Sequence, residues 1–425
     1  MKNLLILLCL ISQISLLGQT KYLHCGNVLD CIGDEPLSEQ TIIVEDNRII
    51  DIREGYLDAP DSVEIIDLKS HYVMPGIMDM HVHIEGQSSP TRYSESFRMN
   101  PRDVALRATT YCKKTLMAGV TTVRDLGGSG VNVSLRNAIN AGYVIGPRIW
   151  TSEKSLATTG GHADPTNGVR DDLKDDPGPK DGVVNSADDA YKAVRQRYKN
   201  GADCIKITAT GGVLSVAKDG MGPQFRTEVI KAVVDAANDY GMVTAAHAHG
   251  AEGMKRAVLG GIHSIEHGTF MTEEVMTLMK ERGTYLVPTI SAGMFAYQKA
   301  KENPRYFPPM VRKKALEVGP HIQATFGKAY KAGVNIAFGT DTGVGPHGSN
   351  LAEFKHMVDA GMPAYEAIKA GTVGSSSLLR ISDMYGTISK GKMADIIAVD
   401  GNPLEDITEM QDVNFVMKDG VIYKQ

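Results

Sequence analysis

Two histidines separated by one residue end the first strongly apolar segment of the chain. His81 and His83 follow the run Pro75–Asp79. In a β-strand, residues i and i+2 face the same side, so both imidazoles would point into one site, and Asp79 shares their parity. Neutral imidazole nitrogens are common ligands of zinc and related divalent ions. Two surface histidines are the alternative, but the position after an apolar run favours a metal site.

Further polar residues end later apolar segments in the same way. They are His247 and His249 in AAHAHG, His267 in SIEHG and Asp341 in GTDTG. Imidazoles and carboxylates together are a usual ligand set for a divalent cation. Each residue alone could be a buried polar group satisfied by hydrogen bonds. Their repeated position at the ends of apolar segments predicts that they converge on one site.

Lys206 is unusual because it lies inside the apolar segment ADCIKIT. A buried ammonium group is costly unless it is paired or neutralised. One alternative is an ion pair with an aspartate or glutamate. The other is addition of carbon dioxide, which would convert the side chain into a carbamate. A carbamate is a two-oxygen anion that can bridge two metal ions.

These residues need a scaffold that brings the ends of several strands together. Eight strand candidates occur between residues 72 and 341, and helical patterns such as 101–119 and 226–241 lie between them and end in glycine. Eight alternating units predict an α/β fold, a closed (β/α)8 TIM barrel with its site at the carboxyl ends of the strands. An open doubly wound sheet is the alternative, but the glycine-rich phosphate loop expected after its first strand is missing.

Both ends of the chain carry short strand patterns rather than helical ones. Asp46-Asn47 and Asp419-Gly420 each join two apolar runs, which is typical of hairpins. We expect residues 20–74 and 385–425 to form one small β-sandwich domain beside a hydrolase barrel of residues 75–384. The segment 167–182 is rich in Asp, Pro, Gly and Lys and is expected to be a surface loop, or a lid over the site.

The N-terminus has the pattern of a secretory signal peptide. A short charged start precedes the apolar run Leu4–Leu17, and Gly18 follows. Residues 1–19 are therefore expected to be removed, with a mature start between Gly18 and Lys21 and a secreted or periplasmic location. An uncleaved membrane anchor and a buried strand are the alternatives. Secretion would permit a disulfide between Cys25 and Cys31, which the sequence leaves open.

Composition narrows the class of partner. The 425 residues are 42% hydrophobic and 22% charged, as in a soluble globular protein, and the formal net charge is −5. No long basic run is present, so nucleic acid is a poor candidate. No serine-nucleophile motif of the GxSxG type is present either, which agrees with metal-based chemistry.

The chain resembles the amidohydrolase superfamily, and within it the imidazolonepropionase-like group that includes Xaa-Pro dipeptidases. Ochratoxin-cleaving amidohydrolases are similar. The resemblance extends from Lys21 to Gln425. The stretches that carry it are PGIMDMHVHI, GVTTVRDLGG, TTGGH, IKITATGG, AAHAHG, SIEHGT, GTDTGVGPHG and GKMADIIAVDGNPLEDI.

The resemblance implies two divalent metal ions per chain, of which zinc is the first candidate. His81, His83 and Asp341 would bind the more buried ion. His247 and His267 would bind the second. Lys206, as N6-carboxylysine, would bridge them. Of the two histidines in AAHAHG, His247 is assigned as the ligand because it precedes His267 by 20 residues.

The resemblance also implies roles in catalysis and substrate binding. Asp341 would transfer the proton of a metal-bound water to the leaving nitrogen. His162, in TTGGH, would polarise the scissile carbonyl or stabilise the oxyanion. His249 shares the parity of His247, so we expect it to bind the substrate's carboxylate; orienting a metal ligand is its alternative role. Homo-oligomers are common among such proteins.

Several functions fit this set of residues. The favoured one is release of a C-terminal amino acid from a dipeptide or an N-acyl amino acid, with ochratoxin-type amides included. Hydrolysis of a cyclic amide or lactam is the alternative. Deaminases share the fold but usually use one metal, so Lys206 argues against them. A non-catalytic binding barrel is the third possibility.

Overall fold

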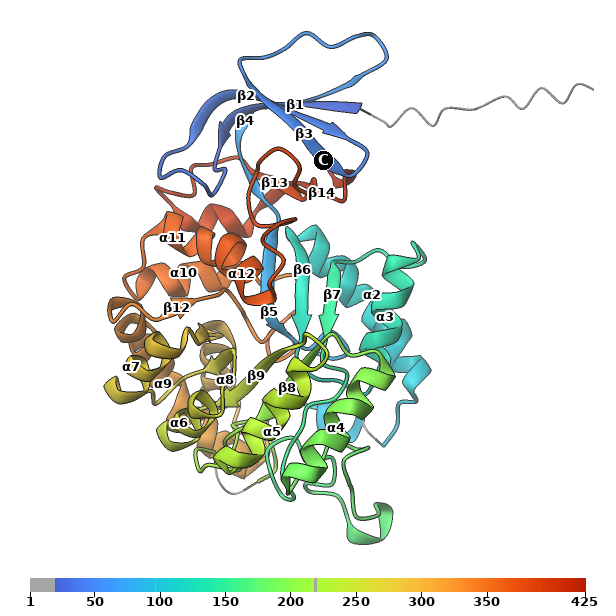
Figure 1. Ribbon diagram of the computed structural model, residues 1–425, viewed down its shortest axis with the longest axis vertical. Helices are drawn as coiled ribbons and strands as arrows, with labels where there is room; N and C mark the ends of the chain where they lie inside the picture. Colours follow the sequence, from blue (N-terminus) through green and yellow to red (C-terminus); the bar gives the residue numbers. More distant parts are fainter. Residues whose placement is uncertain (1–19, 96, 218–219) are drawn as a thin grey trace, which may run out of the picture.

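The computed structural model describes residues 20–425 except 96, 218 and 219. The predicted signal peptide, residues 1–19, lies outside the described residues, so its removal and the location of the protein stay predictions. Within the described part of the chain, no helix combines the length and the apolar character needed to cross a membrane. Figure 1 shows a strand-rich region formed by both ends of the chain, next to a larger region of strands and helices.

The two ends of the chain share one seven-stranded sheet, in the order β15-β14-β13-β4-β1-β2-β3. Both expected hairpins are present, β2 with β3 and β14 with β15. Strand β13 pairs antiparallel with β4, which joins the two ends. The strands are β1 (Thr20–Val28), β2 (Leu37–Glu45), β3 (Arg48–Glu54), β4 (Glu64–Pro75), β13 (Ile396–Val399), β14 (Val413–Lys418) and β15 (Val421–Lys424).

This terminal sheet has its own apolar cluster, which includes Leu23, Ile42, Ile66, Ile396 and Phe415. The arrangement as a sandwich and the predicted domain boundaries stay predictions. Cys25 and Cys31, in this region, do not form a disulfide: both are free, buried thiols.

All eight predicted strands of the central region are present. They form two parallel sheets, with orders β5-β6-β7 and β12-β11-β10-β9-β8. The strands are β5 (Ile77–Val82), β6 (Val120–Asp125), β7 (Arg148–Thr151), β8 (Cys204–Thr208), β9 (Val243–Ala248), β10 (Ser264–His267), β11 (Tyr285–Val287) and β12 (Asn335–Ile336).

Isolated parallel bridges connect the two sheets at both of their edges. Leu156, just after β7, bridges Ile207 of β8, and Val82 of β5 bridges Thr342, which follows β12. Because the bridges and the sheets are all parallel, the carboxyl ends of the eight strands lie on the same side.

Helices follow most of these strands. The two helices expected from the sequence are α2 and α5, and α4 shows the usual end signals: the Ser186 side chain accepts from Asp189 N, and Gly201 ends the helix at φ 92°. The helices are α1 (Arg92–Glu95), α2 (Pro101–Met117), α3 (Val131–Asn140), η1 (Asp171–Leu173), α4 (Ala187–Asn200), α5 (Thr227–Asn238), α6 (Ala251–Leu259), α7 (Glu273–Arg282), α8 (Ile290–Glu302), α9 (Pro309–Lys331), α10 (Ala352–Asp359), α11 (Ala364–Lys369), η2 (Ala370–Gly374), α12 (Ser375–Leu379) and η3 (Ile407–Gln411).

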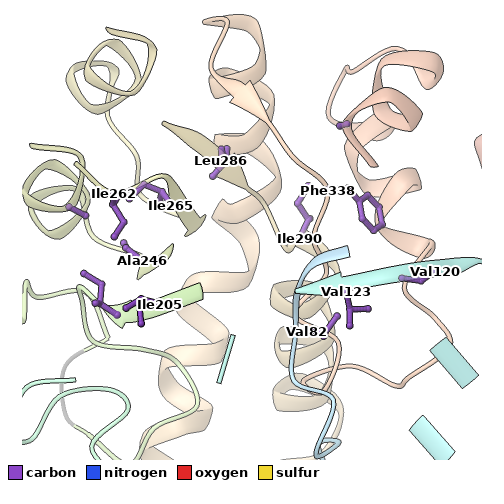
Figure 2. Close-up of a cluster of buried hydrophobic side chains, with 14 of the residues drawn as sticks. Val82, Val120, Val123, Ile205, Ala246, Ile262, Ile265, Leu286, Ile290 and Phe338 are labelled. Carbon is purple, nitrogen blue, oxygen red and sulfur yellow. The ribbon is translucent and has the colours of Figure 1, made fainter. Parts of the chain in front are cut away.

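The largest apolar cluster lies between these strands and their helices. Figure 2 shows Val82 and Val123 of the three-stranded sheet, and Ile205, Ile265 and Leu286 of the five-stranded sheet. These side chains are almost completely buried. Burial of each stabilises the fold by roughly 1.5–3 kcal/mol. A core packed this densely holds the strand ends, and the polar residues on them, in fixed positions.

Candidate metal centre and active site

The first group of predicted ligands lies around Asp341. Its Oδ1 is 3.7 Å from His81 Nε2 and 3.4 Å from His83 Nε2. Lys206 on β8 reaches the same point, with Nζ 3.4 Å from His81 Nε2. Asp341 Oδ1 is buried and makes no hydrogen bond among the described residues. A buried carboxylate oxygen without a donor, facing imidazole nitrogens, fits a cation.

The second group of predicted ligands is a cluster of imidazoles next to the first. His247, His249 and His267 can place one ligand nitrogen each within 4.8 Å of one another, and a second such group combines His267 with His81 and Asp341. The rings of His81 and His267 are 5.0 Å apart between centroids. The structure therefore brings together all six residues predicted to bind metal.

Each of these five histidines is held by a hydrogen bond on one ring nitrogen, which leaves the other nitrogen able to bind a cation. Such outer contacts fix the tautomer and orientation of metal-binding histidines. The contacts are His81 Nδ1 to Glu266 Oε2 at 2.8 Å, His83 Nδ1 to Gly127 O at 2.7 Å, His247 Nε2 to Gly211 O at 3.0 Å, His249 Nδ1 to Thr269 Oγ1 at 2.8 Å and His267 Nδ1 to Thr289 Oγ1 at 2.7 Å. Both His247 and His249 thus retain a free nitrogen, so the assignment of His247 stays a prediction.

Two of the predicted ligands have a strained backbone. His267 has φ 72° and Asp341 has φ 54°, and Thr289, which supports His267, has φ 51°. A left-handed conformation costs a residue with a side chain roughly 1–2 kcal/mol. Strain of this kind persists where the surrounding structure fixes it, and it is concentrated at functional sites.

Burial keeps the imidazoles neutral at neutral pH. It lowers the pKa of His83 and His249 to about 3 and holds the pKa of His81, His247 and His267 well below the usual value. A neutral imidazole has a lone pair to offer a metal ion, whereas a protonated one does not.

The two other charged members of the cluster are also shifted. Burial lowers the pKa of Lys206 to about 8, although Glu266 and Asp341 favour its charge. Burial raises the pKa of Asp341 to about 7, against the positive charges of Lys206 and Arg92. A depressed lysine pKa increases the fraction of neutral amine, which is the form that reacts with carbon dioxide.

His162 lies in the same cavity as the predicted ligands. Its ring stacks on His247 at 4.3 Å between centroids, and its Nδ1 is buried without a hydrogen-bond partner in the described structure. Its backbone N donates to Gln224 Oε1 at 2.8 Å. Gly212 is required beside it, because a Cβ there would lie 2.2 Å from the ring.

Three buried residues that support the site were not assigned roles from the sequence. Glu266 accepts from Arg124 at 2.9 Å and contacts His81, and it is completely buried. Asp79, whose parity the sequence did indicate, accepts from His81 N at 3.1 Å and Thr340 Oγ1 at 2.6 Å. These contacts fix the ends of β5 and β10 and the chain after β12 relative to one another. A charged residue within an otherwise apolar strand was the available signal for Glu266 and Arg124.

One cavity of about 1080 Å³ contains the whole cluster, including His162 and His249. The loop predicted as a possible lid borders it through residues such as Asn167 and Asp176. Another part of its wall is apolar and includes Val213, Phe307 and Ile322. The volume suits a small-molecule ligand.

Residues 72–423 match the Amidohydrolase family. The chain is 32% identical over 413 residues to an ochratoxinase of Aspergillus niger, covering 92% of this chain and 84% of the relative. A solved structure of a Xaa-Pro dipeptidase with bound methionine in the active site is 52% identical, with a TM-score of 0.93, covering 96% of this chain and 100% of that one. A prolidase complexed with N-methylphosphonate-L-proline is 30% identical, with a TM-score of 0.86, covering 96% and 100%.

Proposed function

Because the chain belongs to the amidohydrolase family and is a hydrolase acting on amide bonds, we propose that it uses two divalent metal ions to release a C-terminal amino acid from a dipeptide or an N-acyl amino acid. The observation that carries the proposal is the convergence of the predicted ligands around the unpaired Oδ1 of Asp341. We further propose that the two bridged parallel sheets form a closed (β/α)8 barrel.

His81, His83 and Asp341 would hold one ion, and His247 and His267 the other, which fits the nitrogen and oxygen donors that zinc prefers. When bound, the ions would lower the pKa of a water molecule and polarise the amide carbonyl.

Lys206 would bridge the ions as a carbamate. The neutral amine of Lys206 would add to the carbon of carbon dioxide: a nitrogen–carbon bond forms while one carbon–oxygen π bond opens to an anionic oxygen, and the amine proton is lost to solvent or a neighbouring base. Burial supports this step, because the lowered pKa of Lys206 makes the neutral amine available. The product would place an anion where the ammonium now lies 3.4 Å from His81 Nε2.

Proton transfer is the proposed task of Asp341. It would accept a proton from the attacking water and donate it to the nitrogen that leaves. His162 would donate a hydrogen bond to the carbonyl oxygen through its Nδ1, which has no other partner in the described structure.

The substrate class rests on the relatives and on the cavity. A dipeptidase structure with methionine in its active site, a prolidase with a proline phosphonate and an ochratoxinase all resemble this chain. The apolar wall that includes Val213 and Phe307 suits an apolar side chain of the substrate. We also propose that the protein is exported by residues 1–19 and assembles as a homo-oligomer.

A substrate panel tests the function. Zinc-loaded protein would be incubated with alanyl-methionine, alanyl-proline, N-acetyl amino acids, an ochratoxin-type amide and a lactam, and the free amino acid or ring-opened product would be measured. We expect release of amino acid from linear substrates, and none with Asp341→Asn prepared in parallel as the control for contaminating hydrolases. Ring opening of the lactam with no release from linear amides would favour the cyclic-amide alternative.

A further inference from the structure

Arg92 borders the active-site cavity without an acidic partner. Its guanidinium donates from Nη1 to Gly343 O at 3.0 Å, and no described carboxylate forms an ion pair with it. The side chain is half-buried. Since Gly343 comes two residues after Asp341, this contact places a permanent positive charge on the Asp341 side of the site. The remaining guanidinium donors are available to a ligand.

The segment before Arg92 is docked on the loop that follows β12. Ser88 N also donates to Gly343 O, at 2.7 Å. The backbone N of His347 donates to Gln87 Oε1 at 2.9 Å, and its ring contacts Gly86 O at 2.8 Å. These contacts join the segment to the loop at several points, so the position of the guanidinium is set by the same loop that carries Asp341.

The chemistry of the reaction determines what such a cation would meet. In the proposed mechanism, Asp341 delivers a proton to the leaving nitrogen. In an amino acid, the α-carboxylate is attached to the carbon that bears this nitrogen. The carboxylate of the leaving residue would therefore lie on the Asp341 side as well, where the Arg92 guanidinium is held by Gly343 O.

We propose that Arg92 binds the α-carboxylate of the substrate and so selects amides whose leaving residue has a free carboxyl group. This inference rests on the proposed function, because it concerns the substrate of the same site. An arginine binds a carboxylate through two parallel charge-assisted hydrogen bonds, a geometry that a lysine does not reproduce.

Other candidates for this role are less well placed. His249, which the sequence suggested, faces His247 and His267, where a metal ion would lie, and burial keeps it neutral. Lys174 also borders the cavity but is exposed on the predicted lid loop. Only Arg92, among the described arginines and lysines that border the cavity, is hydrogen-bonded to the loop that follows Asp341.

The test compares alanyl-methionine with its C-terminal amide. We expect Arg92→Met to lower kcat/KM for the free acid by about 10- to 100-fold, mainly by raising KM. For the amide, kcat/KM should change by less than about threefold. Arg92→Lys should lie between the wild type and Arg92→Met. Lys174→Met also removes one positive charge from the rim of the cavity, and its kcat/KM for both substrates should equal that of the wild type.

A binding measurement separates this inference from the proposed function. Calorimetry with L-methionine and L-methioninamide on metal-free protein reports carboxylate recognition without turnover. If no substrate is hydrolysed but Arg92→Met weakens methionine binding selectively, the function is wrong and the carboxylate site stands. If Arg92→Met affects acid and amide equally, or leaves methionine binding unchanged while its melting temperature matches the wild type, the inference is wrong.

Discussion

His81 Nδ1 lies 2.8 Å from Glu266 Oε2, and the two side chains are 1% and 0% exposed. A carboxylate can only accept, so the imidazole donates from Nδ1 and presents a lone pair on Nε2 to the site. Glu266 is held in turn by Arg124 at 2.9 Å and by Ser264 Oγ at 2.5 Å. The orientation of a predicted metal ligand on β5 therefore depends on a buried carboxylate of β10.

The first prediction tests this dependence. Glu266→Gln replaces one accepting oxygen with an NH2 group. This group then faces an N–H of His81 or Arg124, and that hydrogen bond is lost. We expect zinc affinity to fall by about 10- to 100-fold, as is typical when such an outer contact of a metal ligand is lost. Competition with a chromophoric chelator measures it, and Glu273→Gln, on the exposed start of α7, is the control. Unchanged affinity would show that Glu266 does not orient the ligand.

The second prediction concerns the lysine. Lys206→Ala should lower the zinc content from about two ions to about one or fewer per chain and remove most activity, because the bridging anion is lost. Propionate should restore part of the activity by supplying a carboxylate in the same space. Lys192→Ala, on the exposed face of α4, should change neither. A zinc content that stays at two in Lys206→Ala would contradict the bridging role.

The convergence of the residues predicted to bind metal could be foreseen from the sequence because all of them except Lys206 end an apolar segment. Strand periodicity placed His81 and His83 on one side, and the parallel arrangement gathered the strand ends. The same reasoning failed in detail for the last strand. Only Asn335–Ile336 pair as β12. The next residues make separate bonds to both neighbouring strands instead of a continuous ladder: Ala337 N donates to Leu286 O of β11, and Phe338 O accepts from Met80 N of β5.

The supporting contacts could not be predicted because their partners are distant in sequence. Glu266 meets Arg124 across 142 positions, and His267 meets Thr289 across 22. No local pattern encodes such pairs; they exist only once the strands are in register. Arg92 is a similar case. It lies in a polar segment with no periodicity, and only its contact with the distant Gly343 O places it beside the site.

The third prediction is a pH dependence of the metal-free protein. Burial lowers the pKa of His162 to about 3, against about 6.5 in an unfolded chain. As the pH falls below about 6.5, the unfolded chain binds a proton that the folded chain does not, so the free energy of unfolding decreases until about pH 3. Asp341, with its pKa raised to about 7, acts in the opposite direction: its contribution to stability is lost as the pH rises through about 7.

A variant isolates the contribution of His162. In protein treated with a chelator, His162→Leu should make the free energy of unfolding less dependent on pH by about 1.4 kcal/mol per pH unit between about pH 6 and about pH 4. Urea unfolding of both proteins across this range measures the two slopes. Parallel slopes would mean that the native state of the wild type protonates His162 as readily as its unfolded chain does.

Glu353 of α10 is the basis of the fourth prediction. It is completely buried and accepts from Ile290 N and Ser291 N, each at 2.7 Å. These two groups begin α8, so their N–H bonds have no partner within the helix. They directly follow Thr289, whose hydroxyl is 2.7 Å from His267 Nδ1. The carboxyl group thus fixes the start of α8 and, through Thr289, a predicted metal ligand.

Glu353→Gln keeps the size of the side chain but replaces one accepting oxygen with an NH2 group. This NH2 group faces a backbone N–H and cannot accept from it. One buried N–H then loses its partner, and we expect the free energy of unfolding to fall by about 1–3 kcal/mol in urea titrations. Zinc affinity should fall as well, because His267 loses its fixed support.

Glu366→Gln is the matched control. This exposed side chain accepts from Tyr330 OH at 2.8 Å, and its replacement should change the free energy of unfolding by less than about 0.5 kcal/mol. Equal stability of the two variants would show that another group satisfies the start of α8. Lower stability of Glu353→Gln with unchanged zinc affinity would instead limit Glu353 to a structural role.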